Sequence, residues 1–143
     1  MIAQLITSFI ASAAFGVIFN APRRALPQCG FVGMVSWGIY VLMNASYSTV
    51  LASLVATFIV GATSIVFARL YKTPVIIFSV SGIIPLVPGG LAYDAMRHFV
   101  QNDNIAALQL AAQAFFISGA IAIGLVIAEV LNQMLRKLAT KLQ

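Results

Sequence analysis

The residues with the clearest chemical potential follow one short segment, Ser81-Gly82-Ile83-Ile84-Pro85-Leu86-Val87-Pro88-Gly89-Gly90. Asp94, Arg97 and His98 come directly after it, in a sequence that otherwise carries little charge. A carboxylate, a guanidinium and an imidazole within a membrane segment could bind a charged solute or pass a proton along. At this helical spacing they could equally form ordinary pairs, Asp94 with Arg97 and Asp94 with His98. The sequence leaves both interpretations open.

The prolines of this segment predict a break in a helix that begins near Pro74. Pro85 and Pro88 each lack an N–H and crowd the carbonyl four residues earlier, so the carbonyls of Ser81 and Ile84 should lose their helical hydrogen bonds. The two glycines that follow supply conformational freedom, and a second helix is expected after them. In a bilayer, freed backbone groups are tolerated only where protein or a water-filled cavity satisfies them.

Such a break predicts a place for a carboxylate, because the free amides at the start of the second helix would point back at it. The alternative is a plain structural kink, since prolines are more frequent in membrane helices than in soluble ones. Two prolines, two glycines and a charged helix directly afterwards favour the functional interpretation. The candidate substrate-binding residues are therefore Pro85, Pro88, Gly89, Gly90, Tyr93, Asp94 and Arg97.

Composition assigns the chain to the membrane. Hydrophobic residues make up 62% of it and charged residues 8%, against roughly a quarter charged in soluble domains. The formal charge of +5 does not indicate nucleic acid, because the basic residues are dispersed to the ends of apolar runs. The single Cys29 excludes an internal disulfide. No metal-ligand spacing is present, and no cofactor is expected.

The apolar runs predict an all-α membrane protein, a bundle of about five transmembrane helices with one of them broken at Pro85–Gly90. We expect a single integral membrane domain over residues 1–143. The run 28–43 is short for a span and rich in glycine, but charge bias favours its crossing. If it crosses, the basic loops and the basic tail all lie on one side, which puts the amino terminus outside and the carboxy terminus in the cytoplasm. The approximate spans are 2–19, 28–43, 50–68, 74–92 (broken) and 105–131, and the basic groups are Arg23 with Arg24, Arg69 with Lys72, and the tail Arg136, Lys137 and Lys141.

Small residues at four-residue spacing predict close helix packing on several spans. These strips contain Ser8, Ser12 and Gly16; Ser53, Thr57 and Gly61; and Ala120, Gly124 and Ala128. Caps are also predicted. Thr73 should cap the helix that starts at Pro74, and one of the residues 102–104 should cap the last helix.

Other residues allow both a structural and a functional interpretation. Asn20 is either a helix cap or a cavity-lining amide. Arg23, like its neighbour Arg24, is a topology signal or part of a basic entrance that concentrates anions. Glu129 lies near the cytoplasmic end, where a snorkelling acid is the simpler interpretation. Trp37 and its neighbour Tyr40 fall inside a span, where they are expected to pack or to face a partner.

Two sequence boxes resemble the small subunit of the threonine/serine exporter family. One is Phe19-Asn20-Ala21-Pro22-Arg23-Arg24-Ala25-Leu26, and the other is Ile84-Pro85-Leu86-Val87-Pro88-Gly89-Gly90 followed by Tyr93 and Met96. More narrowly, the chain is similar to the carboxy-terminal membrane module that is a separate protein in split systems. The resemblance covers nearly the whole chain. It implies a secondary exporter of the bacterial inner membrane that works with a second, larger membrane subunit.

The resemblance also implies the substrates, since fused members carry threonine and serine outward and split members are associated with export of small dicarboxylates such as succinate. Asp94 or His98 could couple export to protons. Two other function classes are compared with this one. A non-transporting accessory subunit would hold its partner through the small-residue strips, and self-association is a further arrangement. An enzyme has little support, because neither a phosphate-binding loop nor a nucleophile–base pair is present.

Overall fold

The structure, a computed structural model, describes residues 1–141, with only the backbone described for Arg136 and residues 138–141. The described part is helical throughout, with short turns between the helices. Its elements are α1 (Ile2–Ile18), η1 (Arg23–Ala25), α2 (Leu26–Asn44), α3 (Thr49–Tyr71), α4 (Val75–Ile83), η2 (Ile84–Leu86), α5 (Gly89–Val100) and α6 (Asn104–Lys141).

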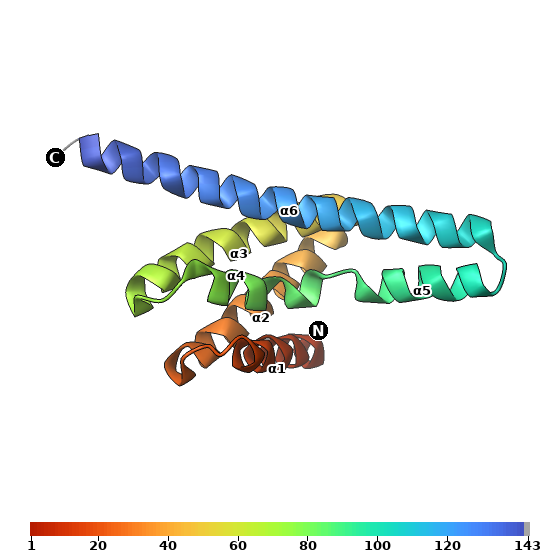
Figure 1. Cartoon of the computed structure of the whole chain (residues 1–143), viewed down its shortest axis with the longest axis horizontal. Helices are drawn as coiled ribbons and strands as arrows, with labels where there is room; N and C mark the ends of the chain where they lie inside the picture. The colour runs from red at the N-terminus through yellow and green to blue at the C-terminus, as the bar shows by residue number, and fades with distance from the viewer. Residues whose placement is uncertain (142–143) are drawn as a thin grey trace.

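Successive helices reverse direction along the long axis of the molecule, and α5 continues in the direction of α4 (Figure 1). The α1–α2 turn, the α3–α4 turn and the end of α6 lie at one end, which we call the basic end because Arg23, Arg24, Arg69 and Lys72 belong to these segments. The start of α1, the α2–α3 turn and the α5–α6 turn lie towards the opposite end. This is the arrangement that charge bias predicted, although the side chains of Arg136 and Lys141 lie outside the described residues.

Helix length and composition fit the predicted membrane bundle. Three helical segments in the described chain are long and apolar enough to cross a membrane, and a bent pair of helices makes a fourth if it counts as one span. α1 is apolar but has 17 residues, about 25 Å at 1.5 Å per residue, which makes it the short member. The broken span is longer than expected, since α5 runs to Val100 rather than ending near residue 92. The three segments are Arg23–Asn44, Thr49–Tyr71 and Asn104–Leu135, and the bent pair is Val75–Leu86 with Gly89–Val100.

The small-residue strips form interfaces inside the chain. A Cβ atom placed on Gly33 would lie 1.8 Å from the Ser12 hydroxyl, so α1 and α2 are in close contact there. A Cβ atom on Gly61 would lie 2.4 Å from Ala128 Cβ, which shows the same for α3 and α6. The packing prediction is confirmed. The idea that these strips hold a partner is wrong, because neighbouring helices of the same chain already cover them.

The two capping predictions have different outcomes. Asp103 caps α6, since its carboxylate accepts a hydrogen bond from the Ala106 amide at 3.3 Å. Thr73 does not cap α4, whose N-cap is Pro74 without a side-chain hydrogen bond. The reason is that Lys72 takes a left-handed conformation (φ 52°) and the Thr73 amide bonds to the Ala68 carbonyl. Thr73 therefore completes the end of α3 instead of starting α4.

Candidate functional site

The predicted break is present between α4 and α5, whose axes differ by 49°. α4 ends at Ile83, η2 continues to Leu86, and Val87 is extended before α5 begins at Gly89. Pro88 cannot donate to the Ile84 carbonyl, which instead accepts the Val87 amide at 3.4 Å. The Gly89 amide in turn donates to the Val87 carbonyl at 2.8 Å. The break is therefore at the prolines, where two tight turns replace the helical bonds.

The first half of the break is closed by protein. The Ser36 hydroxyl of α2 lies 2.8 Å from the Gly82 carbonyl and also 2.8 Å from the Gly33 carbonyl of its own helix, so its single proton is shared between these two acceptors. A Cβ atom on Gly82 would lie 2.5 Å from Val32 and 2.8 Å from Val60, so α2 and α3 press directly on this backbone. Ser81, Gly82 and Leu86 are buried. A solute therefore has no access to the break from this side.

Ser36→Ala is expected to destabilise the chain by about 1–3 kcal/mol, because it leaves the buried Gly82 carbonyl without this donor. Thermal unfolding of the purified chain in detergent would measure the loss. Ser79→Ala is the matched control, since the Ser79 hydroxyl reaches only the Ile76 carbonyl of its own helix, at 3.4 Å. Equal unfolding temperatures for the two variants would contradict the role given to Ser36.

The second half of the break is open. Val87 is 51% exposed, and Cβ atoms placed on Gly89 or Gly90 would meet no atom within 4 Å. Neither glycine has a positive φ, so the expected use of their conformational freedom is wrong; both begin a regular helix. Their contribution is the absence of side chains around the first amides of α5, which no side chain caps.

A cavity of about 310 Å³ lies beside Pro85, between the break and the first two helices. We call it the Trp37 cavity. The walls combine apolar groups with amide, hydroxyl and indole groups, and no charged residue contributes to it. Its lining residues are Gln4, Thr7, Ser8, Ala11, Trp37, Ile84 and Pro85.

Two donors of the Trp37 cavity have no partner in the described chain. The Trp37 indole nitrogen is buried without a hydrogen bond, and the Ser8 hydroxyl makes none, whereas Thr7 bonds to backbone carbonyls of its own helix at 3.0 Å. An indole N–H only donates, so its missing partner must be an acceptor such as a carboxylate oxygen. Sequence analysis expected Trp37 to pack, and only its position as a lone tryptophan within a span marked it out.

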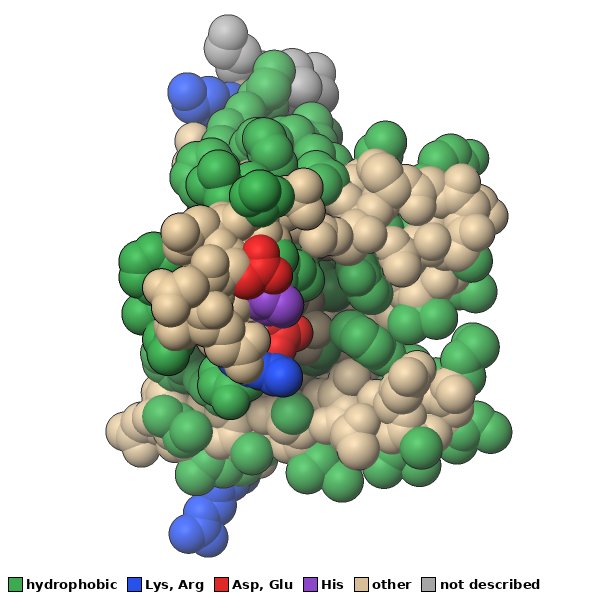
Figure 2. All heavy atoms as spheres, turned by 90° about the vertical axis from the view of Figure 1, so that its right-hand side faces the viewer, with side chains coloured by type: hydrophobic (Ala, Val, Ile, Leu, Met, Phe, Trp, Pro, Cys, Tyr) green, Lys and Arg blue, Asp and Glu red, His purple; other side chains and the backbone are tan. Residues whose placement is uncertain are grey.

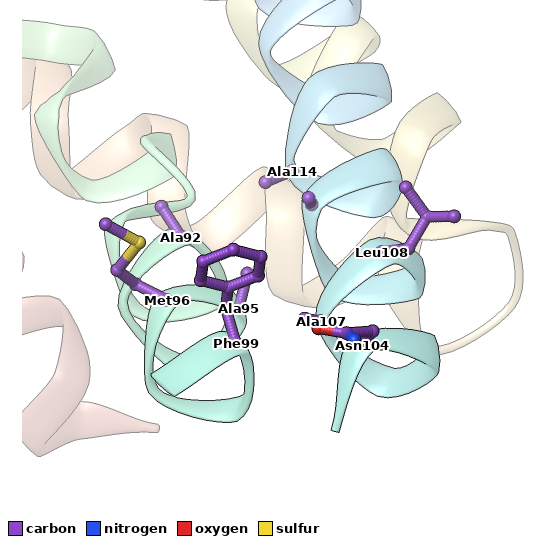
Figure 3. Close-up of a pocket in the computed structure, with 9 residues that line it drawn as sticks. Ala92, Ala95, Met96, Phe99, Asn104, Ala107, Leu108 and Ala114 are labelled. Carbon is purple, nitrogen blue, oxygen red and sulfur yellow. The ribbon is translucent and has the colours of Figure 1, made fainter. Parts of the chain in front are cut away.

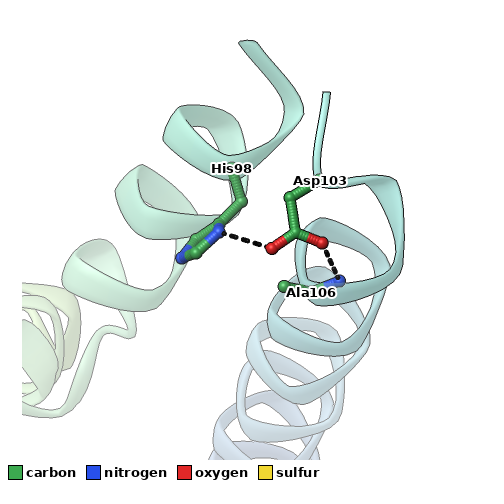
Figure 4. Close-up of polar contacts among 3 residues, drawn as sticks. All are labelled: His98, Asp103 and Ala106. Carbon is green, nitrogen blue, oxygen red and sulfur yellow. Dashed lines mark hydrogen bonds and ion pairs between the residues drawn. The ribbon is translucent and has the colours of Figure 1, made fainter. Parts of the chain in front are cut away.

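The charged side chains of α5 lie at the end opposite the basic end, where Figure 2 shows acidic, histidine and basic groups gathered on one face. His98 pairs with Asp103 at 3.3 Å (Figure 4), and no such pair with Asp94 occurs in the described residues. The interpretation in which Asp94 pairs with Arg97 and with His98 is therefore wrong. Asp94 forms neither pair in the described residues, because the α5–α6 turn brings Asp103 to His98. Asp94 is half-buried, while Tyr93 is 69% exposed.

Two predicted site residues lie at the other end of the bundle. Asn20 follows α1 in a left-handed conformation (φ 55°), and the next amide, of Ala21, bonds to the Gly16 carbonyl at 2.9 Å. This is a helix-terminating turn, in which asparagine is favoured after glycine. Arg23 starts η1 in the same connection and is exposed. The structure thus separates both residues from the break and from α5.

A larger hollow of about 690 Å³ lies between α5 and α6, where the Phe99 ring lies between the two helices and α6 presents alanines (Figure 3). Asn104 is its one polar lining residue. Without a charged group or an unpaired donor, this groove suits lipid or an apolar surface better than a carboxylate.

Apolar helices that reverse direction, one broken span and a partly polar cavity at the break define a polytopic membrane protein of the transport class. The sequence profile of the threonine/serine exporter family, ThrE, matches residues 4–131, which include the break and all the helices except the end of α6. The chain belongs to this family. No solved structure matches it.

Proposed function

We propose that the chain is one subunit of a secondary exporter of small carboxylate metabolites, threonine and serine first, that works with a second, larger membrane subunit. The observation that carries this proposal is the Trp37 cavity beside Pro85, in a member of an exporter family. Two of its lining residues, Trp37 and Ser8, have donors without a partner in the described chain. A substrate carboxylate would accept from Trp37 and Ser8. Succinate or a similar dicarboxylate is the alternative substrate.

The other predicted site residues form the rest of the path in this proposal. The Gly89 amide already donates to the Val87 carbonyl at 2.8 Å, so the open amide at Gly90 would receive the carboxylate as it moves outward, past Tyr93, Asp94 and Arg97 on α5. Arg23, beside Asn20 at the basic end, would attract anions before they enter. No protein group surrounds the two glycines, whereas binding sites enclose most of a small ligand. The second subunit is therefore proposed to complete the site.

We place the protein in the bacterial inner membrane, with the amino terminus outside and the basic end in the cytoplasm. It is proposed to act without enzymatic chemistry, as a conduit that changes conformation around its solute. The rival proposal is an accessory subunit that does not transport. The small-residue strips that it would use to bind a partner are covered by neighbouring helices of the same chain. It would still have the exposed apolar groove between α5 and α6 as a surface.

Efflux of labelled threonine, serine and succinate from cells lacking this chain, its partner or both tests the function. Export should require both proteins and return when both genes are restored. Full export in cells without this chain would refute the proposal. Export by proteoliposomes that contain only the partner would show that this chain is an accessory.

Trp37→Phe should weaken substrate binding by about 10- to 100-fold, because it removes one donor to a charged acceptor, worth about 1.5–3 kcal/mol. The apparent KM for efflux would report the loss. Tyr40→Phe is the control, since Tyr40 stacks on Trp37 with ring centres 5.2 Å apart but does not line the cavity. A normal KM in Trp37→Phe would show that the indole does not bind the substrate.

A further inference from the structure

A second polar hollow lies towards the basic end, between α3, α4 and α6. It consists of two adjoining parts of about 200 Å³ and 140 Å³, which share Ile65 and Val75 as lining residues. Arg69 and Thr73 line the larger part, and Glu129 lines the smaller part. We call the whole the Arg69–Glu129 groove. It brings both signs of charge to one small space on a chain with 8% charged residues.

Thr73 provides an unpaired hydroxyl to this groove. Its oxygen is buried without a hydrogen bond partner in the described chain, because the residue ends α3 and does not cap α4. A buried polar group without a partner is destabilising unless water or a ligand pairs with it. The hydroxyl can donate to an anion while its lone pairs accept.

The Arg69 guanidinium has N–H donors beyond the one that bonds to Asn132. One of its terminal nitrogens donates to the Asn132 side-chain oxygen, which fixes the guanidinium against α6. A guanidinium carries five N–H donors in a planar fork that matches a carboxylate. Arg69 and Thr73 both line the larger part of the groove. This part of the groove therefore suits an anion.

Glu129 supplies the opposite charge. It precedes Asn132 by one helical turn on α6, so both residues project from the same face. Its carboxylate accepts from Gln133 at 3.2 Å, and no salt bridge joins it to Arg69 in the described residues. Glu129 is exposed where it lines the smaller part of the groove, so its carboxylate is accessible to a cationic ligand. An ammonium group in this part of the groove would be such a ligand.

We propose that the Arg69–Glu129 groove binds a zwitterionic α-amino acid, with its carboxylate at Arg69 and Thr73 and its ammonium at Glu129. This inference rests on the proposed function and deepens it, because it assigns an entry site at the basic end and a basis for selectivity. A dicarboxylate would bring its second negative charge to Glu129 and be rejected. The same pair of charges occurs in a phosphoethanolamine lipid headgroup, which the experiment must separate from a free amino acid.

The test measures binding to the full-length chain in nanodiscs of phosphatidylcholine and phosphatidylglycerol, by saturation-transfer NMR. L-threonine and L-serine should bind, whereas N-acetyl-threonine, threonine amide and succinate should bind at least about tenfold more weakly, since each lacks one of the two charge contacts. Glu129→Gln should weaken threonine binding about tenfold and remove the preference over N-acetyl-threonine. Arg69→Gln should remove the preference over threonine amide.

Lys72→Gln is the control, because it deletes an exposed positive charge next to the groove without lining it. Absence of threonine binding to the chain, or equal affinity in Glu129→Gln and Lys72→Gln, would overturn the inference. Loss of threonine binding when phosphatidylethanolamine is added to the nanodiscs would also overturn it, by identifying the headgroup as the occupant. If threonine binding depended on Glu129 but cells showed no export, the proposed function would be refuted, while the groove would still be supported as a binding site. If Glu129→Gln still exported threonine with unchanged selectivity, the proposed function would be supported and the binding role of the groove would be refuted.

Discussion

Replacing Gly89 and Gly90 together by valine is expected to reduce export to the level of cells that lack the chain, while membrane insertion continues. The chain itself can accommodate the new side chains, since a Cβ atom at either position meets nothing within 4 Å. The valines would instead cover the first amides of α5 and occupy the open side of the break. Efflux of labelled threonine, normalised to the amount of chain in the membrane, would measure the effect.

Gly119→Val is the matched control for this pair. Gly119 is also a helical glycine with open space around it. It lies on the face of α6 opposite Ile117 and Ile121, which pack with Leu86 of the break. Its variant should export normally. If the double valine variant also exported normally, neither the amides of α5 nor the space around them would take part in transport, and the Trp37 cavity would have to serve without them.

The parts of the fold that follow from local chemistry could be predicted from the sequence. A proline removes a backbone donor wherever it stands, so the break at Pro85 and Pro88 is the same in the sequence and in the structure. Basic residues at the ends of apolar runs predicted which turns share one end of the bundle. The end of the broken span was less predictable. The second helix itself was expected, but the span was placed only as far as residue 92, whereas α5 runs to Val100. An amphipathic helix packed on α6 need not be as apolar as a span.

The candidate sites depend on contacts between helices, which no local pattern encodes. Trp37 belongs to a cavity only because α1 and η2 lie beside α2. Likewise, Glu129 gains significance from Arg69 and Thr73, which are distant in sequence and were interpreted as a topology signal and a cap. The failed capping prediction is informative here, because the hydroxyl that does not cap α4 is left unpaired in the groove.

Even the small-residue strips had two interpretations in the sequence, internal packing or a partner's surface. Spacing shows that helices can approach closely but not which helix does so. The structure assigns them to α1 with α2 and to α3 with α6. A partner must therefore use other surfaces, among which the apolar groove of α5 and α6 is the largest hollow described.

Gly124→Val is expected to cause a large loss of stability, because the backbone of α3 lies directly against this glycine of α6. A Cβ atom on Gly124 would lie 2.8 Å from the Leu54 carbonyl oxygen and 3.1 Å from the Phe58 amide nitrogen. Both are backbone atoms, which cannot rotate away as a side chain can. The helices must then separate, at a cost of about 1–3 kcal/mol or more.

Thermal unfolding of the purified chain in detergent would measure this loss, with Gly119→Val as control on the same helix. The variant also links packing to the proposed entry site, since the α3–α6 interface brings Asn132 to Arg69, and Glu129 precedes Asn132 by one helical turn. Threonine binding should therefore weaken in Gly124→Val even though no groove residue has changed. Unfolding temperatures equal to those of the control would mean that α3 and α6 do not meet at Gly124, and the Arg69–Glu129 groove would lose the interface that builds it.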